Sequence, residues 1–249
     1  MIKRILLGIG GTPFTAVGIE RAVEIASQND ARLTAVTVVD PNNICKFGPV
    51  PAGAAIYAKR MCENRLEVTK DQIGDAVAAL EKICKQSGVR YDVEWETGTP
   101  FDLMINHSRY HDLTVFGLRS LFDYQLVESP EKDLIQLLSQ GVRPILAVSS
   151  QYRPIRRVMI AYSGSMESAK AMRRFVQCCL WPDAELEIVH FSAKPDDSNF
   201  LLKDAAAYCQ DHGFKVNTRM VLGKAHDRLL STAQEIEADM IVMGNSIRS

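Results

Sequence analysis

The sequence predicts an α/β protein made of two tandem domains, each built around a doubly wound parallel sheet. Three observations lead to this prediction. The chain repeats itself once, segments of strand length alternate with segments of helical period, and most strand segments are almost solid Val, Ile and Leu. Solid apolar strands are buried on both faces, as in a parallel sheet that helices cover on each side.

Three sequence blocks recur in the same order and at nearly the same spacing. KRILLGIGGT at 3–12 returns as RRVMIAYSGS at 156–165, GTPFDLM at 98–104 as GKAHDRL at 223–229, and HDLTVFG at 111–117 as ADMIVMG at 238–244. The period is about as long as a whole domain, which indicates a duplicated domain rather than a solenoid repeat. We therefore place one domain at residues 1–149 and a second at 155–249, joined by the polar linker SSQYRP.

Each element of the first half follows from its apolar period. Continuous or alternating apolar runs predict strands, and apolar positions three or four residues apart predict helices. The predicted order is strand 5–9, helix 16–27, strand 33–39, helix 62–86, strand 91–96, helix 101–108, strand 113–116, helix 131–138 and strand 144–148. Gly88 ends the long helix, and the alternation in 91–96 indicates a half-buried edge strand.

The second half repeats this pattern but stops early. After its first strand, the predicted order is helix 168–180, strand 185–190, helix 201–211, strand 215–221, helix 225–237 and strand 240–243. The last helix and strand of the first half have no counterpart. We interpret the second domain as incomplete and the chain as truncated, with a partner chain that supplies the strand as the alternative. Without that strand, residues 240–243 stay unpaired on one side.

Residues 40–53 form a long connection after the second strand. The segment holds three Pro and two Gly and has no periodicity that would bury it. Loops of this kind are often lids. We expect it to be the most mobile internal segment of the first domain.

Composition excludes several classes of function. A net charge of −1 gives no basic footprint for nucleic acid, and no apolar run approaches the length of a transmembrane helix. The apolar run at the N-terminus is too short for a signal peptide and recurs inside the chain. The six cysteines have no CxxC spacing, so we expect reduced thiols in the cytoplasm and no disulfide.

The repeated blocks resemble the universal stress protein family in its tandem form. The strongest match is ADMIVMG at 238–244, followed by the opening strand KRILL and the helix starts after Gly98 and Gly223. The resemblance spans essentially the whole chain. It implies two Rossmann-like domains with strand order 3-2-1-4-5, a cytoplasmic role in stress adaptation without established catalysis, and ATP binding in some members but not in others.

The ligand crevice of a doubly wound sheet lies beyond the carboxyl ends of strands 1 and 4. Glycine lets backbone N–H groups approach phosphate there, and a helix N-terminus favours negative charge. The alternative is that small residues only make the turn and cap the helix. The candidate site residues are Gly10, Gly11, Thr12, Val39, Gly117, Arg119 and Ser120 in the first domain, and Ser163, Gly164, Ser165, Gly244 and Asn245 in the second.

ATP-binding members of the family carry an Asp after strand 1 and a Gly-x-x-Gly loop, followed nine residues later by Gly-Ser/Thr. The Asp position is Gly10 in one half and Ser163 in the other. In the first domain Ser120 replaces the second loop Gly, and Val127-Glu128 occupies the place of Gly-Ser/Thr. A carboxylate repels a triphosphate in a poorly solvated crevice, so we expect this domain to lack ATP.

The function predicted is therefore non-catalytic binding of a ligand or partner in the stress response. An adenine nucleotide such as ATP or AMP in the second domain is the alternative, and a scaffold or sensor with a repurposed crevice is the competing class. SGSMES at 163–168 differs at two positions from the SGGxDS loop of ATP pyrophosphatases, which keeps an enzyme as a further alternative. The cofactor is unknown.

No metal site is expected, because His107 and His111 straddle a helix end with no carboxylate ligand set. For partners, we expect pairing of the two domains and a possible homodimer, without nucleic acid or membrane.

Overall fold

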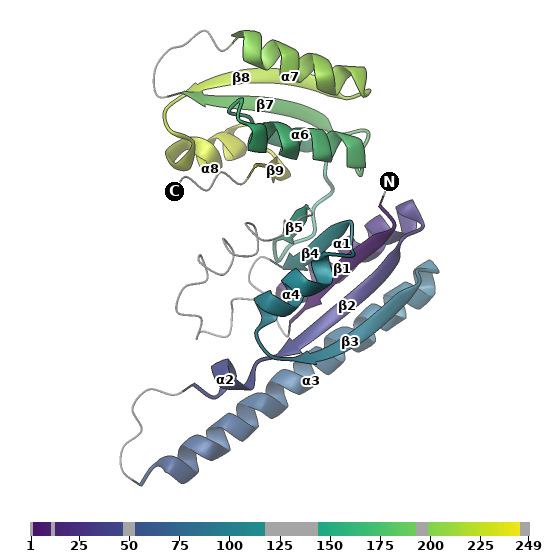
Figure 1. Ribbon diagram of the computed structural model, residues 1–249, viewed down its shortest axis with the longest axis vertical. Helices are drawn as coiled ribbons and strands as arrows, with labels where there is room; N and C mark the ends of the chain where they lie inside the picture. Colours follow the sequence, from purple (N-terminus) through teal and green to yellow (C-terminus); the bar gives the residue numbers. More distant parts are fainter. Residues whose placement is uncertain (1, 11–12, 47–52, 118–143, 193–198, 245–249) are drawn as a thin grey trace. The chain divides into compact units, whose positions relative to one another are not determined.

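A computed structural model describes residues 2–10, 13–46, 53–117, 144–192 and 199–244. Within these residues the chain divides into two compact units, Ile2–Tyr152 and Arg153–Ser249. Each unit holds one parallel sheet. The strand order is β3-β2-β1-β4-β5 in the first and β8-β7-β6-β9 in the second. The predicted fold class and the order 3-2-1-4-5 are confirmed (Figure 1).

The first unit alternates strands and helices as its apolar period requires. Its elements are β1 (Arg4–Ile9), α1 (Pro13–Asn29), β2 (Arg32–Val39), α2 (Pro41–Ile44), α3 (Ala55–Ser87), β3 (Tyr91–Thr97), α4 (Pro100–Ser108), β4 (Leu113–Gly117) and β5 (Ile145–Val148). As predicted, Gly88 caps α3: it adopts the left-handed conformation, and its N–H donates to the carbonyl of Cys84. The helix predicted at 131–138 lies outside the described residues.

The second unit repeats these elements. They are β6 (Arg157–Ala161), α6 (Met166–Cys178), β7 (Glu185–Ser192), α7 (Asn199–Asp211), β8 (Lys215–Leu222), α8 (Ala225–Glu235) and β9 (Met240–Val242). In the described part of the chain β9 pairs with β6 alone and so forms one edge of the sheet.

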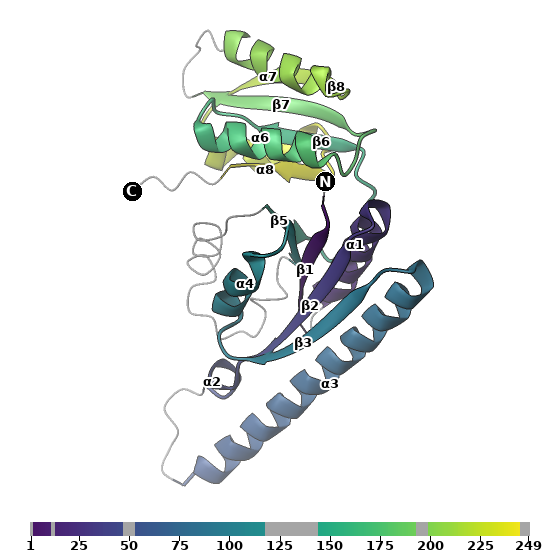
Figure 2. The same ribbon diagram turned by 45° about the vertical axis from the view of Figure 1, so that its right-hand side comes forward.

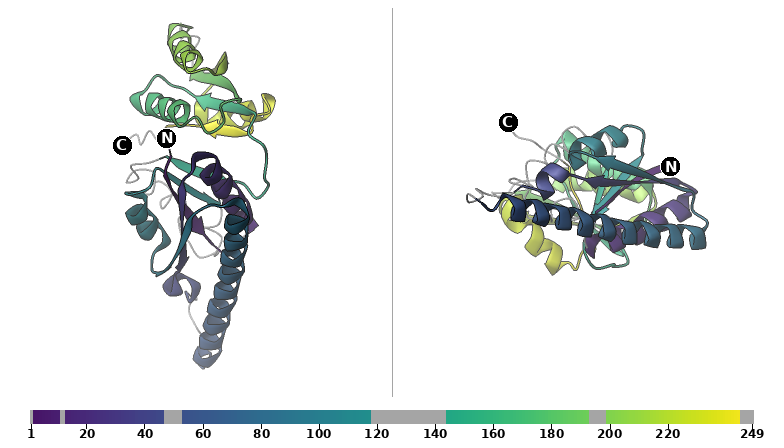
Figure 3. Two further views of the ribbon diagram at one scale, coloured as in Figure 1. Left: turned by 90° about the vertical axis from the view of Figure 1, so that its right-hand side faces the viewer. Right: turned by 90° about the horizontal axis from the view of Figure 1, so that it is seen from below.

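Helices cover both faces of each sheet, which is why the central strands are apolar throughout. In the first unit α3 and α4 lie on opposite faces (Figures 2 and 3), and Met104 of α4 packs with Leu6 and Phe116 of the sheet. In the second unit α6 and α7 pack on the face that carries Ile160, whereas α8 packs on the opposite face. The burial of both faces produced the solid apolar strands in the sequence.

The long helix α3 begins at Ala55, seven residues before the predicted start. The prediction was wrong here because it relied on an apolar stripe. The first turns of α3 have no such stripe facing a core, and the side chains of Ile56 and Tyr57 are 73% and 69% exposed. Amphipathic period marks only the part of a helix that packs against something.

The first part of residues 40–53 is more ordered and more buried than its sequence suggested. Residues Pro41–Ile44 form the short helix α2, and the side chain of Ile44 is buried. The expectation that nothing in this segment is buried is therefore wrong for its first part, while residues 47–52 lie outside the described residues.

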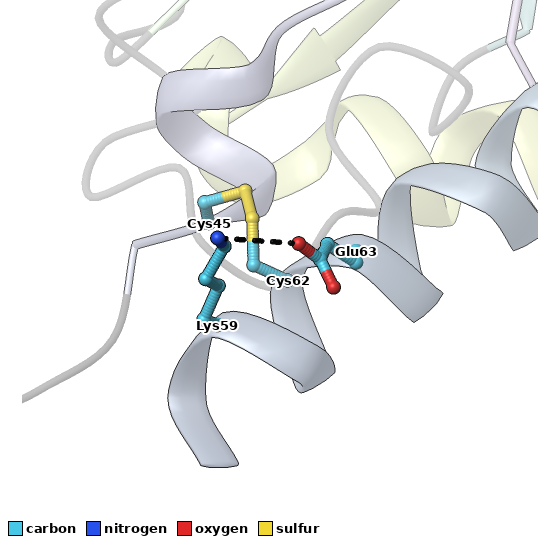
Figure 4. The surroundings of a disulfide bond; sticks show 4 residues. All are labelled: Cys45, Lys59, Cys62 and Glu63. Carbon is cyan, nitrogen blue, oxygen red and sulfur yellow. Dashed lines mark ion pairs between the residues drawn. A yellow bond between two sulfur atoms is a disulfide. The ribbon is translucent and has the colours of Figure 1, made fainter. Parts of the chain in front are cut away.

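A disulfide joins Cys45, directly after α2, to Cys62 in the second turn of α3 (Figure 4). The expectation of no disulfide is wrong. Pairing depends on Cα atoms that approach within bonding reach, here 4.9 Å, and on a chain reversal that brings α2 beside α3. A sequence separation of 17 residues carries no sign of that reversal. The ion pair between Lys59 and Glu63, 3.9 Å apart, flanks the bond.

The aspartate in the third repeated block connects strands in both units. Asp112 Oδ2 accepts the backbone N–H groups of Lys3 and Arg4 at 2.9 and 3.1 Å. Asp239 Oδ2 accepts those of Arg156 and Arg157, both at 2.9 Å. Each carboxylate therefore fixes the start of the first strand against the fourth. This structural role explains why the Asp recurs in both copies.

We expect Asp239→Asn to lower the free energy of unfolding of the second unit by about 1.5 kcal/mol, because hydrogen bonds to a charged acceptor are the stronger kind. Urea unfolding followed by circular dichroism measures the change. The matched control is Asp183→Asn on an exposed turn, which should change stability by less than about 0.5 kcal/mol. Equal effects of the two substitutions would contradict the assigned role.

Candidate functional site

The turn after β6 is closed by its own side chains. Ser165 is the N-cap of α6, and its hydroxyl accepts the N–H of Ser168 at 3.2 Å. The hydroxyl of Ser168 donates to the carbonyl of Ser165 at 2.9 Å and accepts the N–H of Ser163 at 3.3 Å. A backbone N–H at the start of α6, which has no partner within the helix, is thus satisfied by a side chain of the turn.

The turn after β1 carries a comparable hydrogen bond, in which the hydroxyl donates rather than accepts. The buried hydroxyl of Thr15 donates to the carbonyl of Gly10 at 2.5 Å. Thr15 follows Gly10 by five residues, as Ser168 follows Ser163, so a hydroxyl holds the same place in both copies. Gly11 and Thr12 lie outside the described residues.

Gly117 and Gly244 lie where the fourth strand of each sheet passes the helix that follows the first strand. A Cβ atom on Gly117 would lie 2.4 Å from Cβ of Phe14, and one on Gly244 would lie 2.4 Å from the carbonyl oxygen of Glu167. Neither position has room for a side chain. The glycines permit close packing of helix on strand, a requirement that exists without any ligand.

The remaining candidate residues lie in different surroundings in the two domains. Gly164 has φ of 77°, in the left-handed region, and a Cβ there would lie 2.7 Å from a methyl carbon of Leu201. Val39 ends β2 half-buried, and its carbonyl accepts the N–H of Gly98 at 3.2 Å. Arg119, Ser120 and Asn245 lie outside the described residues. The structure therefore brings Ser163, Gly164, Ser165 and Gly244 together at one end of the second sheet.

Two further polar groups lie near the end of β6. His190 of β7 is buried, with Nδ1 2.9 Å from the carbonyl oxygen of Tyr162, as expected for a packed histidine. Burial, together with the carboxylate of Asp204, raises the pKa of the Tyr162 phenol. Sequence patterns did not single out Tyr162, because an aromatic residue at a strand end is equally typical of a core.

His107 has two carboxylate neighbours, contrary to the expectation from sequence. Its Nδ1 lies 3.2 Å from Oε2 of Glu94, and its Nε2 lies 3.5 Å from Oε1 of Glu96. Glu94 and Glu96 alternate with Val93 and Trp95 on β3 and so point to the face that α4 covers. The sequence did contain one signal of this arrangement: residues at i and i+2 of a strand share one face, so the two glutamates had to point the same way. Their meeting with His107 depended on the path of α4.

The neighbouring His111 behaves as a packed residue. Its ring is buried, its Nδ1 lies 2.7 Å from the carbonyl oxygen of His107, and burial lowers its pKa. Among the described residues, no helix is both long and apolar enough to cross a membrane.

The comparison with protein families fits this geometry. The model of the universal stress protein family matches residues 1–134. The chain belongs to the universal stress protein family. A universal stress protein of Synechocystis is 21% identical over 257 residues, covering 98% of this chain and 89% of that protein. Both halves of the tandem arrangement therefore have counterparts in one relative.

A solved structure of a universal stress protein from Archaeoglobus fulgidus has the same fold. It superposes with a TM-score of 0.61 at 17% identity, and the match covers 96% of this chain and 83% of that one. At this identity the likeness concerns the fold alone. The function of the two strand-end turns in this universal stress protein depends on its own residues.

Proposed function

We propose that this universal stress protein acts by binding rather than by turnover, and that its first domain does not bind ATP. One observation supports this most directly: in both domains a hydroxyl of the first helix is hydrogen-bonded to the residue that follows the first strand, which is Gly10 in one and Ser163 in the other. No carboxylate is placed there to orient a nucleotide or its metal ion.

The hydroxyl groups of the second crevice also argue against covalent catalysis. Ser163 Oγ lies 3.1 Å from Ser165 Oγ and 3.3 Å from Ser168 Oγ. An activated nucleophile needs an adjacent base, and these partners are hydroxyls. In the described part of the crevice, the chemistry supports recognition of a ligand.

A second candidate function is binding of an adenine nucleotide in the second domain. The favouring observation is exposure: Ser163 and Gly164 face solvent at the N-terminus of the 13-residue helix α6. A helix N-terminus favours an anionic group. The hydroxyl network would exchange some of its internal hydrogen bonds for bonds to that group.

We expect the chain to bind ATP with a Kd in the millimolar range or weaker. Losing two charge-assisted hydrogen bonds of about 1.5–3 kcal/mol each moves a micromolar site to about millimolar. Calorimetric titration with ATP measures this directly.

If any binding is detected, Ser163→Glu should weaken it at least about tenfold, because a carboxylate would face the phosphates. The control Ser231→Glu, half-buried on α8 and outside the turn after β6, should leave it unchanged. Micromolar affinity that survives Ser163→Glu would place the nucleotide elsewhere and defeat the proposal.

A further inference from the structure

We infer that Glu94, Glu96 and His107 form a binding site for a divalent transition-metal cation, for which Zn²⁺ is the best match. The three residues come from β3 and α4 of the first domain. One potential ligand atom from each residue lies within 4.8 Å of the others.

The spacing suits a small cation. A tetrahedral zinc ion with bonds of about 2.0–2.2 Å holds its ligand atoms about 3.3 Å apart. Nδ1 of His107 lies 3.2 Å from Oε2 of Glu94, and Nε2 lies 3.5 Å from Oε1 of Glu96, so either ring nitrogen has one carboxylate oxygen at this spacing. One ring nitrogen would bind the cation while the other donates its N–H to a carboxylate, the arrangement that orients metal-binding histidines. The glutamate that accepts this N–H orients the ring, and the other glutamate supplies a carboxylate oxygen to the cation.

Each ring nitrogen of His107 has a carboxylate neighbour. A neutral imidazole carries one N–H and one lone pair, yet both ring nitrogens of His107 face carboxylate oxygens. In the neutral ring one carboxylate therefore meets a lone pair, and a proton or a metal cation at that nitrogen removes the repulsion. A dication would remove this repulsion and balance the two negative charges of Glu94 and Glu96.

The second domain shows that the fold does not need these residues. Val36 and Val189 occupy equivalent positions in the second strand of each sheet. Glu94 pairs with Val36 and Arg219 pairs with Val189, so Glu94 and Arg219 are equivalent as well. By the same alignment Glu96 corresponds to Val221, and His107, nine residues after Gly98, corresponds to Thr232, nine after Gly223. None of the three ligand types is repeated. Their convergence in the first domain therefore is not a requirement of the shared architecture.

The ligand set and its exposure indicate the class of cation. The side chains of His107, Glu94 and Glu96 are 22%, 43% and 36% exposed, so an ion can enter from solvent and water can complete its coordination. One imidazole nitrogen with carboxylate oxygens suits zinc, whereas magnesium prefers oxygen ligands alone.

Calorimetric titration of the full chain with Zn²⁺ tests the inference. We expect one saturable site, no comparable binding of Mg²⁺, and a rise in Tm on adding Zn²⁺. His107→Gln and Glu96→Gln should each weaken Zn²⁺ binding about tenfold or more and remove the rise in Tm. If His107→Gln proves unstable, Glu96→Gln decides, because the valine at the equivalent strand position of the second domain shows that the fold tolerates a neutral residue there.

The matched control is His226→Gln. His226 is an exposed histidine that meets a single carboxylate, with Nε2 2.9 Å from Oδ1 of Asp227, and this substitution should leave Zn²⁺ binding unchanged. A Cys178→Ser, Cys179→Ser double variant controls for thiolate binding. The inference is overturned if no saturable site is found, if His107→Gln and Glu96→Gln bind as well as the natural chain, or if either control abolishes binding. In the first two cases the three side chains form only an ion-pair cluster.

Discussion

Gly244→Ala should lower the free energy of unfolding of the second domain by about 3 kcal/mol, and Gly117→Ala should do the same to the first. The Cβ atom of an alanine at position 244 would lie 2.4 Å from the carbonyl oxygen of Glu167 and 2.7 Å from the backbone nitrogen of Ser168, both at the start of α6. Backbone atoms cannot rotate away as a side chain can. Helix and strand must therefore separate, and the contacts between them weaken.

The matched control is Gly74→Ala in the middle of α3. A Cβ on Gly74 meets nothing within 4 Å, so alanine should stabilise the first domain by about 0.5–1 kcal/mol through helix propensity. Urea unfolding, with separate probes for each domain, measures all three variants. If Gly117→Ala and Gly244→Ala unfold like the natural chain, the close helix–strand approach is not as described. The two glycines would then be free for a ligand role.

Reduction of the Cys45–Cys62 disulfide should destabilise the first domain by about 3 kcal/mol, the effect expected for opening a loop of this length. The loss should be concentrated in α2 and the first turns of α3, which the bond holds together. Comparing unfolding with and without a reductant gives the magnitude. Hydrogen exchange of residues 41–46 locates the change.

A Cys45→Ser, Cys62→Ser double variant provides the control, because its stability should not respond to the reductant. Two of the four free thiols help to interpret the experiment: burial raises the pKa of Cys84 and of Cys209 to about 11, so both should react slowly at neutral pH, whereas Cys178 and Cys179 react alike before and after reduction. Reduction should therefore expose two newly reactive thiols. Equal stability of the oxidised and reduced chains would show that the bond does not constrain the fold.

The repeated blocks and the apolar period alone determined the fold of this protein. Strands buried on both faces must be apolar throughout, and helices that cover a sheet must carry an apolar stripe, so both leave a local record in the sequence. The same reasoning placed the crevice residues Ser163, Gly164 and Ser165 in one turn. It failed at the start of α3, because an exposed helix has no stripe to leave.

Only the tertiary structure decided which side chains meet across elements. The sequence shows only that Asp112 and Asp239 recur in the repeated block. The structure shows that each accepts two backbone N–H groups at the start of another strand. From sequence, Gly117 and Gly244 suit a phosphate loop and a packing contact equally well. The structure shows the start of a helix packed so closely on each that a Cβ atom would clash. The chain reversal between α2 and α3 brings Cys45 to Cys62. The path of α4 brings His107 to its two glutamates. Such meetings depend on where whole elements pack, and no window of sequence of the length of one strand or helix contains that information.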